Sequence, residues 1–337
     1  MAEKPIIICT RGSALALAQS NMIAAMCRAA FPKLRFELKI IKTTGDKLQK
    51  ASMAKTNAAS LPKGLFTKEL EVALLRGQAD IAVHSLKDLP VDLPAGLMLA
   101  ATPKREDVRD VLIYRDAEFL KRRTVSQDWT PGQSALRGFK AHTKLKDFPS
   151  GATIATSSTR RKMSLLAVRP SLNIVEIRGN VATRMQKVAE RGDLDATILA
   201  LAGMKRLNFD INADGTISGD AVPDGLLATV LDLDEMLPCV GQGAIGIEIR
   251  ADDERIVKIC ERLNHFNTFH AVTAERAFLR GMGGGCQSPV GAFAEIAGDK
   301  ISLRAISFRD ETVKRGEGKR PIAEAAQLGE QIAAELK

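Results

Sequence analysis

Three groups of residues in this chain have types and spacings suited to chemistry on an anionic ligand. In the first, an apolar run that ends at Val83 leads into His84-Ser85-Leu86-Lys87-Asp88. A carboxylate at a strand end beside a lysine can act as an acid, a base or a counter-charge for a cation. On pattern alone, a solvated turn is the commoner explanation of Lys87 and Asp88, and His84 is more often a satisfied core or turn histidine than a catalyst.

The second group is a pair of basic turns, each placed after a short apolar run. Ser157-Ser158-Thr159-Arg160-Arg161 follows the first run, and Arg178-Gly179-Asn180, with Arg184 further on, follows the second. Hydroxyl groups at a helix start cap free N–H groups. Two adjacent arginines in a first helical turn oppose the helix dipole, and this costs stability unless an anion is bound there. Gly179 allows close approach of the backbone; Arg178 and Arg184 could equally be solvated charges.

The third group is a glycine-rich run that contains a cysteine, Gly281-Met282-Gly283-Gly284-Gly285-Cys286-Gln287-Ser288-Pro289. Consecutive glycines cost backbone entropy, so the run is a poor structural filler and would present Cys286 on an uncrowded loop. A thiolate near arginines is nucleophilic. With no histidine nearby, covalent attachment is favoured over hydrolysis, although a turn cysteine without a role is the more common case.

Composition favours a small anionic ligand over nucleic acid. The 337 residues carry 49 Lys and Arg against 40 Asp and Glu, a net charge of +9. The longest basic runs are short, and only one Trp and one Tyr are available for stacking on bases. We find no secretory signal and no apolar stretch long enough for a membrane span. An odd number of cysteines without C-x-x-C spacing argues against a disulfide framework or a metal site and indicates a reducing cytoplasm.

Strand and helix patterns alternate along most of the chain, which predicts an α/β fold with a largely parallel sheet. Expected helices cover 14–31 and 159–168, and residues 43–64 and 208–225 are expected to be a long loop and a surface excursion. After residue 267 a helix, several alternating strands and a final helix indicate a small α+β domain. In α/β sheets, ligands bind at the carboxyl ends of strands, where the basic turns lie. The ligand is therefore expected to be polyanionic.

With these motifs assembled, the chain closely resembles the porphobilinogen deaminase family, also called hydroxymethylbilane synthase, over nearly its whole length. The resemblance rests on ordered motifs at compatible spacing, namely Thr10-Arg11-Gly12-Ser13 with Gln19, Lys63-Gly64-Leu65-Phe66, Ala82–Asp88, Thr156-Ser157-Ser158 with Arg160-Arg161, Arg178-Gly179-Asn180-Val181 with Arg184, Val240–Ala244, Ala274-Glu275-Arg276 and Gly284–Gln287.

The resemblance implies three domains. Two are α/β lobes of the periplasmic-binding-protein type around a cleft, at 1–104 with 242–264 and at 105–241; the third, 265–337, is α+β and carries a cofactor loop. It also implies a transferase that condenses four porphobilinogen molecules with loss of ammonia into hydroxymethylbilane. The reaction is primed by a dipyrromethane cofactor joined through a thioether to Cys286.

The same resemblance assigns roles to residues. Asp88 would handle the leaving amine, stabilise the cationic azafulvene and assist the later deprotonation. Each pyrrole carries an acetate and a propionate, and the residues implied for cofactor carboxylates are Ser85, Lys87, Asp88, Thr156, Ser157, Ser158, Arg160, Arg161, Gly179 and Arg184. Those implied for the incoming substrate and growing chain are Arg11, Ser13, Gln19, Lys63, Phe66, Arg178, Arg184 and Gln242.

Two other functions remain open on the residues alone. A two-lobed anion sensor would need the arginines but neither Asp88 nor the Cys286 loop. Nucleic-acid binding is weakly supported, since the positive charge lies at turns rather than in stripes. The family implies a cytoplasmic monomer without nucleic-acid or membrane partners, with porphobilinogen and the growing oligopyrrole as its ligands.

Overall fold

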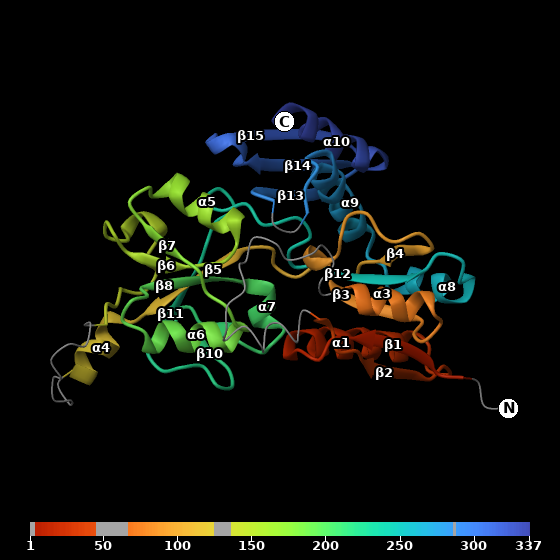
Figure 1. The fold of residues 1–337 in the computed structure, drawn as a ribbon, viewed down its shortest axis with the longest axis horizontal. Coiled ribbons are helices and arrows are strands. Elements are labelled where there is room, and N and C mark those ends of the chain that lie inside the picture. The colour runs from red at the N-terminus through yellow and green to blue at the C-terminus, as the bar shows by residue number, and fades with distance from the viewer. Residues whose placement is uncertain (1–3, 45–66, 125–135, 286–287) are drawn as a thin grey trace. The chain divides into compact units, whose positions relative to one another are not determined.

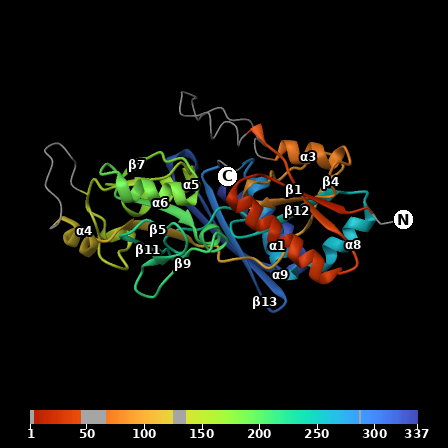
Figure 2. The ribbon, with the colours of Figure 1, turned by 90° about the horizontal axis from the view of Figure 1, so that it is seen from below.

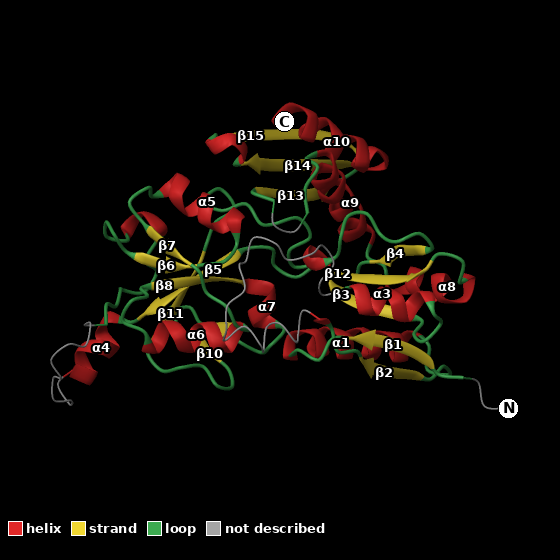
Figure 3. Cartoon of the chain, viewed as in Figure 1, coloured by secondary structure: helices red, strands yellow, loops and turns green. Residues whose placement is uncertain are grey.

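The structure, a computed structural model, describes residues 4–44, 67–124, 136–285 and 288–337. The chain forms two compact units, which are described separately. Unit 1 comprises Met1–Glu106, Cys239–Ser307 and Lys314–Lys337, and unit 2 comprises Asp107–Pro238 and Phe308–Val313. The α/β class and the small C-terminal α+β part are confirmed (Figures 1 and 3).

The first sheet of unit 1 has five strands. In spatial order they are β2 (Phe36–Ile40), β1 (Ile6–Thr10), β3 (Ile81–Ser85), β12 (Ile245–Arg250) and β4 (Leu97–Ala101). β1 is parallel to both β2 and β3, whereas β12 is antiparallel to β3 and β4. The prediction of a largely parallel sheet is therefore only half right, because a strand from a distant part of the chain enters the sheet in the opposite direction.

Helices cover both faces of this sheet. Helices α1 (Ala14–Ala30) and α8 (Glu254–Leu263) pack on one face, and α3 (Lys68–Leu75) packs on the other (Figure 2). Because both faces are covered, nearly all of β3 is buried and reads as an apolar run. The strand ends in a short 3₁₀ turn, η2 (Leu86–Asp88). This turn places the carboxylate of Asp88 at the end of β3.

Unit 2 contains a second mixed sheet. Its order is β11 (Leu226–Val230), β5 (Asp110–Arg115), β8 (Ala196–Ala200), β6 (Thr153–Ala155) and β7 (Asn173–Val175). β6 is parallel to β7 and β8, while β5 is antiparallel to its neighbours. The 208–225 excursion contains a small hairpin of β9 (Asp210–Ile211) and β10 (Ile217–Ser218).

Both faces of the second sheet are also covered. Helix α5 (Thr159–Val168) packs on one face, and α6 (Val181–Glu190) and α7 (Leu201–Lys205) pack on the other. The remaining elements of the unit are α4 (Ala117–Thr124), η3 (Leu145–Asp147) and η4 (Arg309–Glu311). The parallel strands β6 and β7 feed directly into α5 and α6, so two helix N-termini lie at their carboxyl ends.

The C-terminal part of unit 1 is a three-stranded antiparallel sheet packed against two helices. The elements are α9 (Phe266–Gly281), β13 (Val290–Ala297), β14 (Lys300–Ser307), β15 (Lys314–Pro321), η5 (Ile322–Glu324) and α10 (Ala325–Leu336). Gly329 lets α10 approach α9 closely, because a Cβ there would lie 2.2 Å from the carbonyl oxygen of Ala274.

Glu275, a fully buried residue of α9, ties this part to the rest of unit 1. Its carboxylate accepts two hydrogen bonds from the guanidinium of Arg105, at 2.6 and 2.9 Å. It also accepts the backbone N–H groups of Gly241, at 2.8 Å, and Ala294, at 3.0 Å. Four charge-assisted hydrogen bonds satisfy this buried carboxylate and fix α9 against three chain segments.

In the part of the chain that the structure describes, no helix combines the length and apolar character needed to cross a bilayer.

Candidate active site

Five of the expected site residues of unit 1 line one pocket. Arg11 and Ser13 come from the turn between β1 and α1, Gln19 from α1, and Ser85 and Asp88 from the end of β3 and the turn that follows. The strands concerned are parallel neighbours, so their carboxyl ends meet at one edge of the sheet. The predicted placement at strand ends is confirmed for Arg11, Ser13, Ser85 and Asp88, whereas Gln19 lies within α1.

Hydrogen bonds fix the polar walls of this pocket. The Gln19 side chain is buried and exchanges two hydrogen bonds with the Ser85 hydroxyl, at 2.9 and 3.0 Å. The Ser13 hydroxyl accepts the N–H of Ala16 at 3.3 Å, as expected of a helix cap. Ser85 and Gln19 therefore orient each other, and Ser13 is held in place as the cap of α1.

Asp88 is exposed, whereas the backbone that carries it is tightly held. Gly241 has a φ of +72°, and a Cβ at this position would lie 3.3 Å from the backbone N of Lys87. Glycine is required there because of both the left-handed conformation and the close approach. Lys87 is half-buried beside Asp88. The result is an accessible carboxylate on a rigid turn.

His84 is a core histidine, the alternative favoured by its sequence pattern. Its Nε2 lies 2.9 Å from Oε2 of Glu248 on the neighbouring strand β12, and both side chains are buried. Burial and the charge of Glu248 raise the pKa of nearby Glu71, with the Thr67 hydroxyl acting in the opposite direction. Sequence reasoning did not single out Glu248, which belongs to a strand distant in the chain, whereas Glu71 lies on α3, the helix directly before β3.

In unit 2, the predicted turns cap the helices that follow them. Ser158 caps α5 by accepting the N–H of Arg161, and Asn180 caps α6 by accepting the N–H of Thr183. The buried Thr156 hydroxyl accepts the N–H of Ser158. Ser157 has a structural task, because its hydroxyl bonds to the backbone of Ile177 and joins the ends of the two strands.

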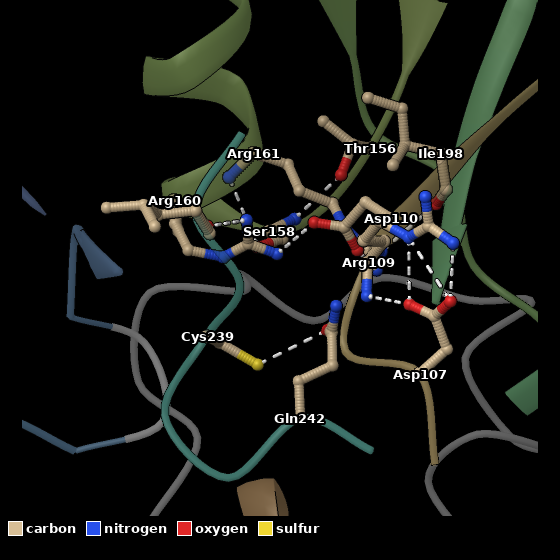
Figure 4. A network of polar contacts seen from close by, with 11 residues as sticks. Asp107, Arg109, Asp110, Thr156, Ser158, Arg160, Arg161, Ile198, Cys239 and Gln242 are labelled. Atoms are coloured by element: carbon tan, nitrogen blue, oxygen red, sulfur yellow. Dashed lines mark hydrogen bonds and ion pairs between the residues drawn. The ribbon is translucent and has the colours of Figure 1, made fainter. Parts of the chain in front are cut away.

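Asp110 supplies an anion for the two adjacent arginines of α5 (Figure 4). Its carboxylate lies 2.8 Å from Nη2 of Arg160 and 2.6 Å from Nη2 of Arg161, and all three side chains are buried. Arg160 also donates to the carbonyl of Leu237, and Arg161 to that of Ile198. The inference that an anion must accompany these arginines is sound, but a carboxylate of this chain meets the need, and no sequence signal marked Asp110.

Arg184 lies in a less favourable electrostatic environment. Burial, first, and the positive charge of Arg161, second, lower its pKa to about 10. Its Nε donates to the carbonyl of Gly179. A guanidinium with a lowered pKa remains charged at neutral pH, so an anion placed beside it would relieve both effects.

Arg178 and Gly179 lie directly before helix α6. Arg178 is exposed, and its guanidinium lies 4.0 Å from the carboxylate of Glu176. Gly179 has a φ of +122°, and a Cβ there would lie 2.7 Å from the Thr183 side chain. The helix start itself thus requires this glycine, whether or not a ligand approaches the backbone.

Gln242 belongs to unit 1 but is not among the described residues that line the pocket of Asp88. It is buried, its carbonyl accepts Nε of Arg105, and its side-chain oxygen lies 3.5 Å from Sγ of Cys239 (Figure 4). Cys239 is half-buried, whereas Cys9, Cys27 and Cys260 are buried. Lys63, Phe66, Cys286 and most of the 43–64 loop lie outside the described residues.

Two family models match the chain: porphobilinogen deaminase, dipyromethane cofactor binding domain, over residues 6–258, and porphobilinogen deaminase, C-terminal domain, over residues 269–337. The chain belongs to the porphobilinogen deaminase family. It is 40% identical to a porphobilinogen deaminase of Syntrophomonas wolfei, covering 97% of this chain and 93% of the relative. For the enzyme of Carboxydothermus hydrogenoformans the identity is 40%, covering 99% and 94%.

A search of solved structures matched, among others, the periplasmic aliphatic sulphonate binding protein SsuA of Escherichia coli. It is 11% identical, with a TM-score of 0.36, covering 83% of this chain and 70% of that one. This similarity is too low to add to the fold, which rests on the strand orders given above.

The residues of unit 2 fit the dipyrromethane cofactor of a porphobilinogen deaminase. Such a group carries several carboxylates, and the strand ends of this unit offer the N-termini of α5 and α6 together with guanidinium groups. Arg184 is the residue that points most specifically to an anionic ligand, because its surroundings destabilise its positive charge and a carboxylate would stabilise it. When bound, the cofactor supplies the pyrrole carbon to which substrate is joined.

Asp110→Asn is expected to lower the free energy of unfolding by about 3–5 kcal/mol, because it leaves two buried guanidinium groups without their carboxylate. Urea unfolding of the purified variant measures this loss. An unchanged midpoint would show that the Asp110 charge does not stabilise the helix start.

Asp107→Asn is the matched control for Asp110. Partial burial raises the Asp107 pKa, but hydrogen bonds from Arg109 outweigh that effect and lower it overall. Because this pair is more exposed than the Asp110 cluster, its removal should cost less than about 1 kcal/mol.

Proposed function

We propose how the residues of this chain divide the work of the family's reaction. The chain is a hydroxymethylbilane synthase, a transferase of tetrapyrrole synthesis that condenses porphobilinogen on a dipyrromethane cofactor. In this proposal unit 1 carries out the chemistry on the substrate, and the basic strand ends of unit 2 hold carboxylates of the cofactor.

Asp88 is the proposed catalytic residue. As the substrate's C–N bond breaks, the electron pair leaves with nitrogen as ammonia and a cation remains on the substrate. The Asp88 carboxylate accepts the pyrrole N–H, stabilises this cation, and takes part in proton transfer to the amine and later from the pyrrole carbon. The observation that carries this role is the shared pocket, where an exposed carboxylate lies with Arg11 and Ser13.

Further residues are proposed to bind carboxylates of the pyrroles. The residues that would contact the incoming substrate and growing chain are Arg11, Ser13, Gln19, Lys63, Phe66, Arg178, Arg184 and Gln242. Ser85, Lys87, Thr156, Ser157, Ser158, Arg160, Arg161, Gly179 and Arg184 would contact the cofactor. Arg160 and Arg161 already bind Asp110, so they contribute mainly by keeping positive charge at the start of α5.

The attachment point of the cofactor is proposed to be the Cys286 thiol, through a thioether. Support comes from the glycines that precede it, which suit an uncrowded loop. In contrast, burial raises the pKa of Cys9 to about 12 and that of Cys260 to about 12, which leaves those thiols poor nucleophiles.

The wider organisation follows the same proposal. The chain would fold as three domains with the boundaries predicted above and act as a cytoplasmic monomer, without nucleic-acid or membrane partners. The placement of its positive charge at strand ends rather than in stripes supports a small acidic ligand. A non-catalytic anion sensor is the competing function, and it would need neither Asp88 nor Cys286.

Asp88→Asn is expected to lower kcat by about 10²- to 10⁴-fold with little change in KM, because the amide keeps the shape but loses the charge and the proton-transfer capacity. Consumption of porphobilinogen by cofactor-loaded protein measures it. Asp252→Asn, at an exposed aspartate of the same unit, should remain fully active. Normal turnover by the Asp88 variant would reject its catalytic role.

Cys286→Ser is expected to abolish activity and to remove the dipyrrole mass from the intact protein, because a serine hydroxyl is a far weaker nucleophile than a thiolate. Cys239→Ser should keep the added mass. Intact mass spectrometry distinguishes the two variants, and a dipyrrole retained on the Cys286 variant would move the attachment point elsewhere.

Arg184→Met is expected to reduce cofactor loading while the unloaded protein keeps its stability to within about 1 kcal/mol, the value of the lost bond to Gly179. The reason is that a cation destabilised by burial and by Arg161 stabilises the protein only when an anion is bound. Lys162→Met, an exposed change on α5, should alter neither property. A large stability loss with normal loading would make Arg184 a purely structural residue.

A further inference from the structure

The segment that follows Asp88 has no regular structure, yet two arginines of α9, Arg276 and Arg280, hold it in place. Leu89 to Asp92 form neither helix nor strand, and Pro90 has no backbone N–H to donate. Their carbonyl groups therefore need donors from elsewhere, since an unpaired buried carbonyl is costly.

Arg276 supplies most of these donors, and Arg280 adds one to the carbonyl of Val91 at 3.0 Å and one to the Asp92 carboxylate at 2.9 Å. Nη1 of Arg276 donates to the carbonyl of Leu89 at 3.2 Å, and its Nη2 donates to those of Pro90 at 2.7 Å and Val91 at 3.2 Å. The Arg276 side chain is only 8% exposed. A planar guanidinium can reach several oxygen atoms in a fixed geometry, which a lysine ammonium on a flexible stem does less well.

Apolar packing also secures parts of this segment, since Val91 packs against the core of the C-terminal sheet and helices. Leu86 and Leu89 are buried against Ala244 and Val272. On another side lies a cavity of about 400 Å³, whose lining includes Val91, Asp92, Leu93 and Arg276 itself. Because this side is open, the hydrogen bonds of Arg276, with those of Arg280 further along, restrain the backbone next to Asp88; Arg276 is the one that binds the two carbonyls nearest to Asp88.

Helix α9 is itself firmly anchored at this point. The residue before Arg276 is Glu275, whose four hydrogen bonds fix the helix to Arg105, Gly241 and Ala294. Gly241 in turn packs against the backbone of Lys87. The helix ends at Gly281, shortly before Cys286 in the sequence.

We propose that Arg276 is a positioning residue for Asp88. By binding the three consecutive carbonyls directly after Asp88, Arg276 keeps the Asp88 carboxylate in a fixed position relative to α9, the helix that precedes Cys286 in the sequence. The inference rests on the proposed role of Asp88. It adds that turnover depends on a guanidinium that touches neither the substrate nor the cofactor.

The test compares Arg276→Met and Arg276→Lys in the full-length, cofactor-loaded enzyme. The first removes the donors and the charge, and the second keeps the charge. We expect the Met variant to retain its dipyrrole mass, to lose about 10- to 100-fold in kcat with KM nearly unchanged, and to show faster amide hydrogen exchange in residues 86–91. Compared with the Met variant, the Lys variant should show a smaller loss of kcat and a smaller increase in amide exchange at residues 86–91.

Arg115→Lys is the matched control. Arg115 is another buried arginine that donates to backbone carbonyls, those of Arg137, Val188, Arg191 and Leu194, but it lies in unit 2. Its replacement should lower global stability without a selective change in exchange at residues 86–91. This separates a local effect on the segment from a general loss of stability.

The outcomes distinguish the inference from the function on which it rests. Unchanged exchange at residues 86–91 in Arg276→Met, or faster exchange there with normal kcat, would overturn the positioning role. A loss of kcat that the Arg115 variant reproduces at equal stability would overturn it as well. Normal turnover by Asp88→Asn in the same assay would instead reject the proposed catalytic role of Asp88.

Discussion

The arginines at the start of α5 in unit 2 depend on one interaction, a buried carboxylate that binds two guanidinium groups. Asp110, at the start of β5, binds both Arg160 and Arg161 in the first turn of α5. Without it, two cations would lie buried at the positive end of a helix dipole. With it, the guanidinium groups of Arg160 and Arg161 stay buried near the end of β6, whereas an unpaired lysine or arginine there would extend into water.

This arrangement gives the neighbouring Arg184 its character. Its pKa is lowered by burial and by Arg161, so the folded chain holds a cation at some cost in free energy. A ligand carboxylate would recover that cost on binding. The electrostatics of unit 2 therefore suit the acidic dipyrromethane of the family. The feature that suits it is the partly uncompensated positive charge of Arg184 rather than a large number of charges.

Unit 1 follows a different principle, in which an exposed carboxylate is carried by backbone that buried residues hold in place. Asp88 is accessible, but Gly241 packs against the backbone before it, and Arg276 holds the carbonyls after it. Glu275 joins these two supports through one carboxylate. Rigid placement matters for the role proposed for Asp88, because a carboxylate stabilises a developing positive charge only if it lies close to that charge.

The sequence by itself determined the features that depend on near neighbours in the chain. The helix caps Ser13, Ser158 and Asn180, the strand-to-helix turns and the family motifs are all local, and each could be recognised without coordinates. Only the tertiary structure decided which charges meet. Asp110 and Arg160, and His84 and Glu248, are far apart in sequence. A local pattern shows that a charge exists, but strand order and register determine its partner, and β12 even enters its sheet antiparallel to the expected direction.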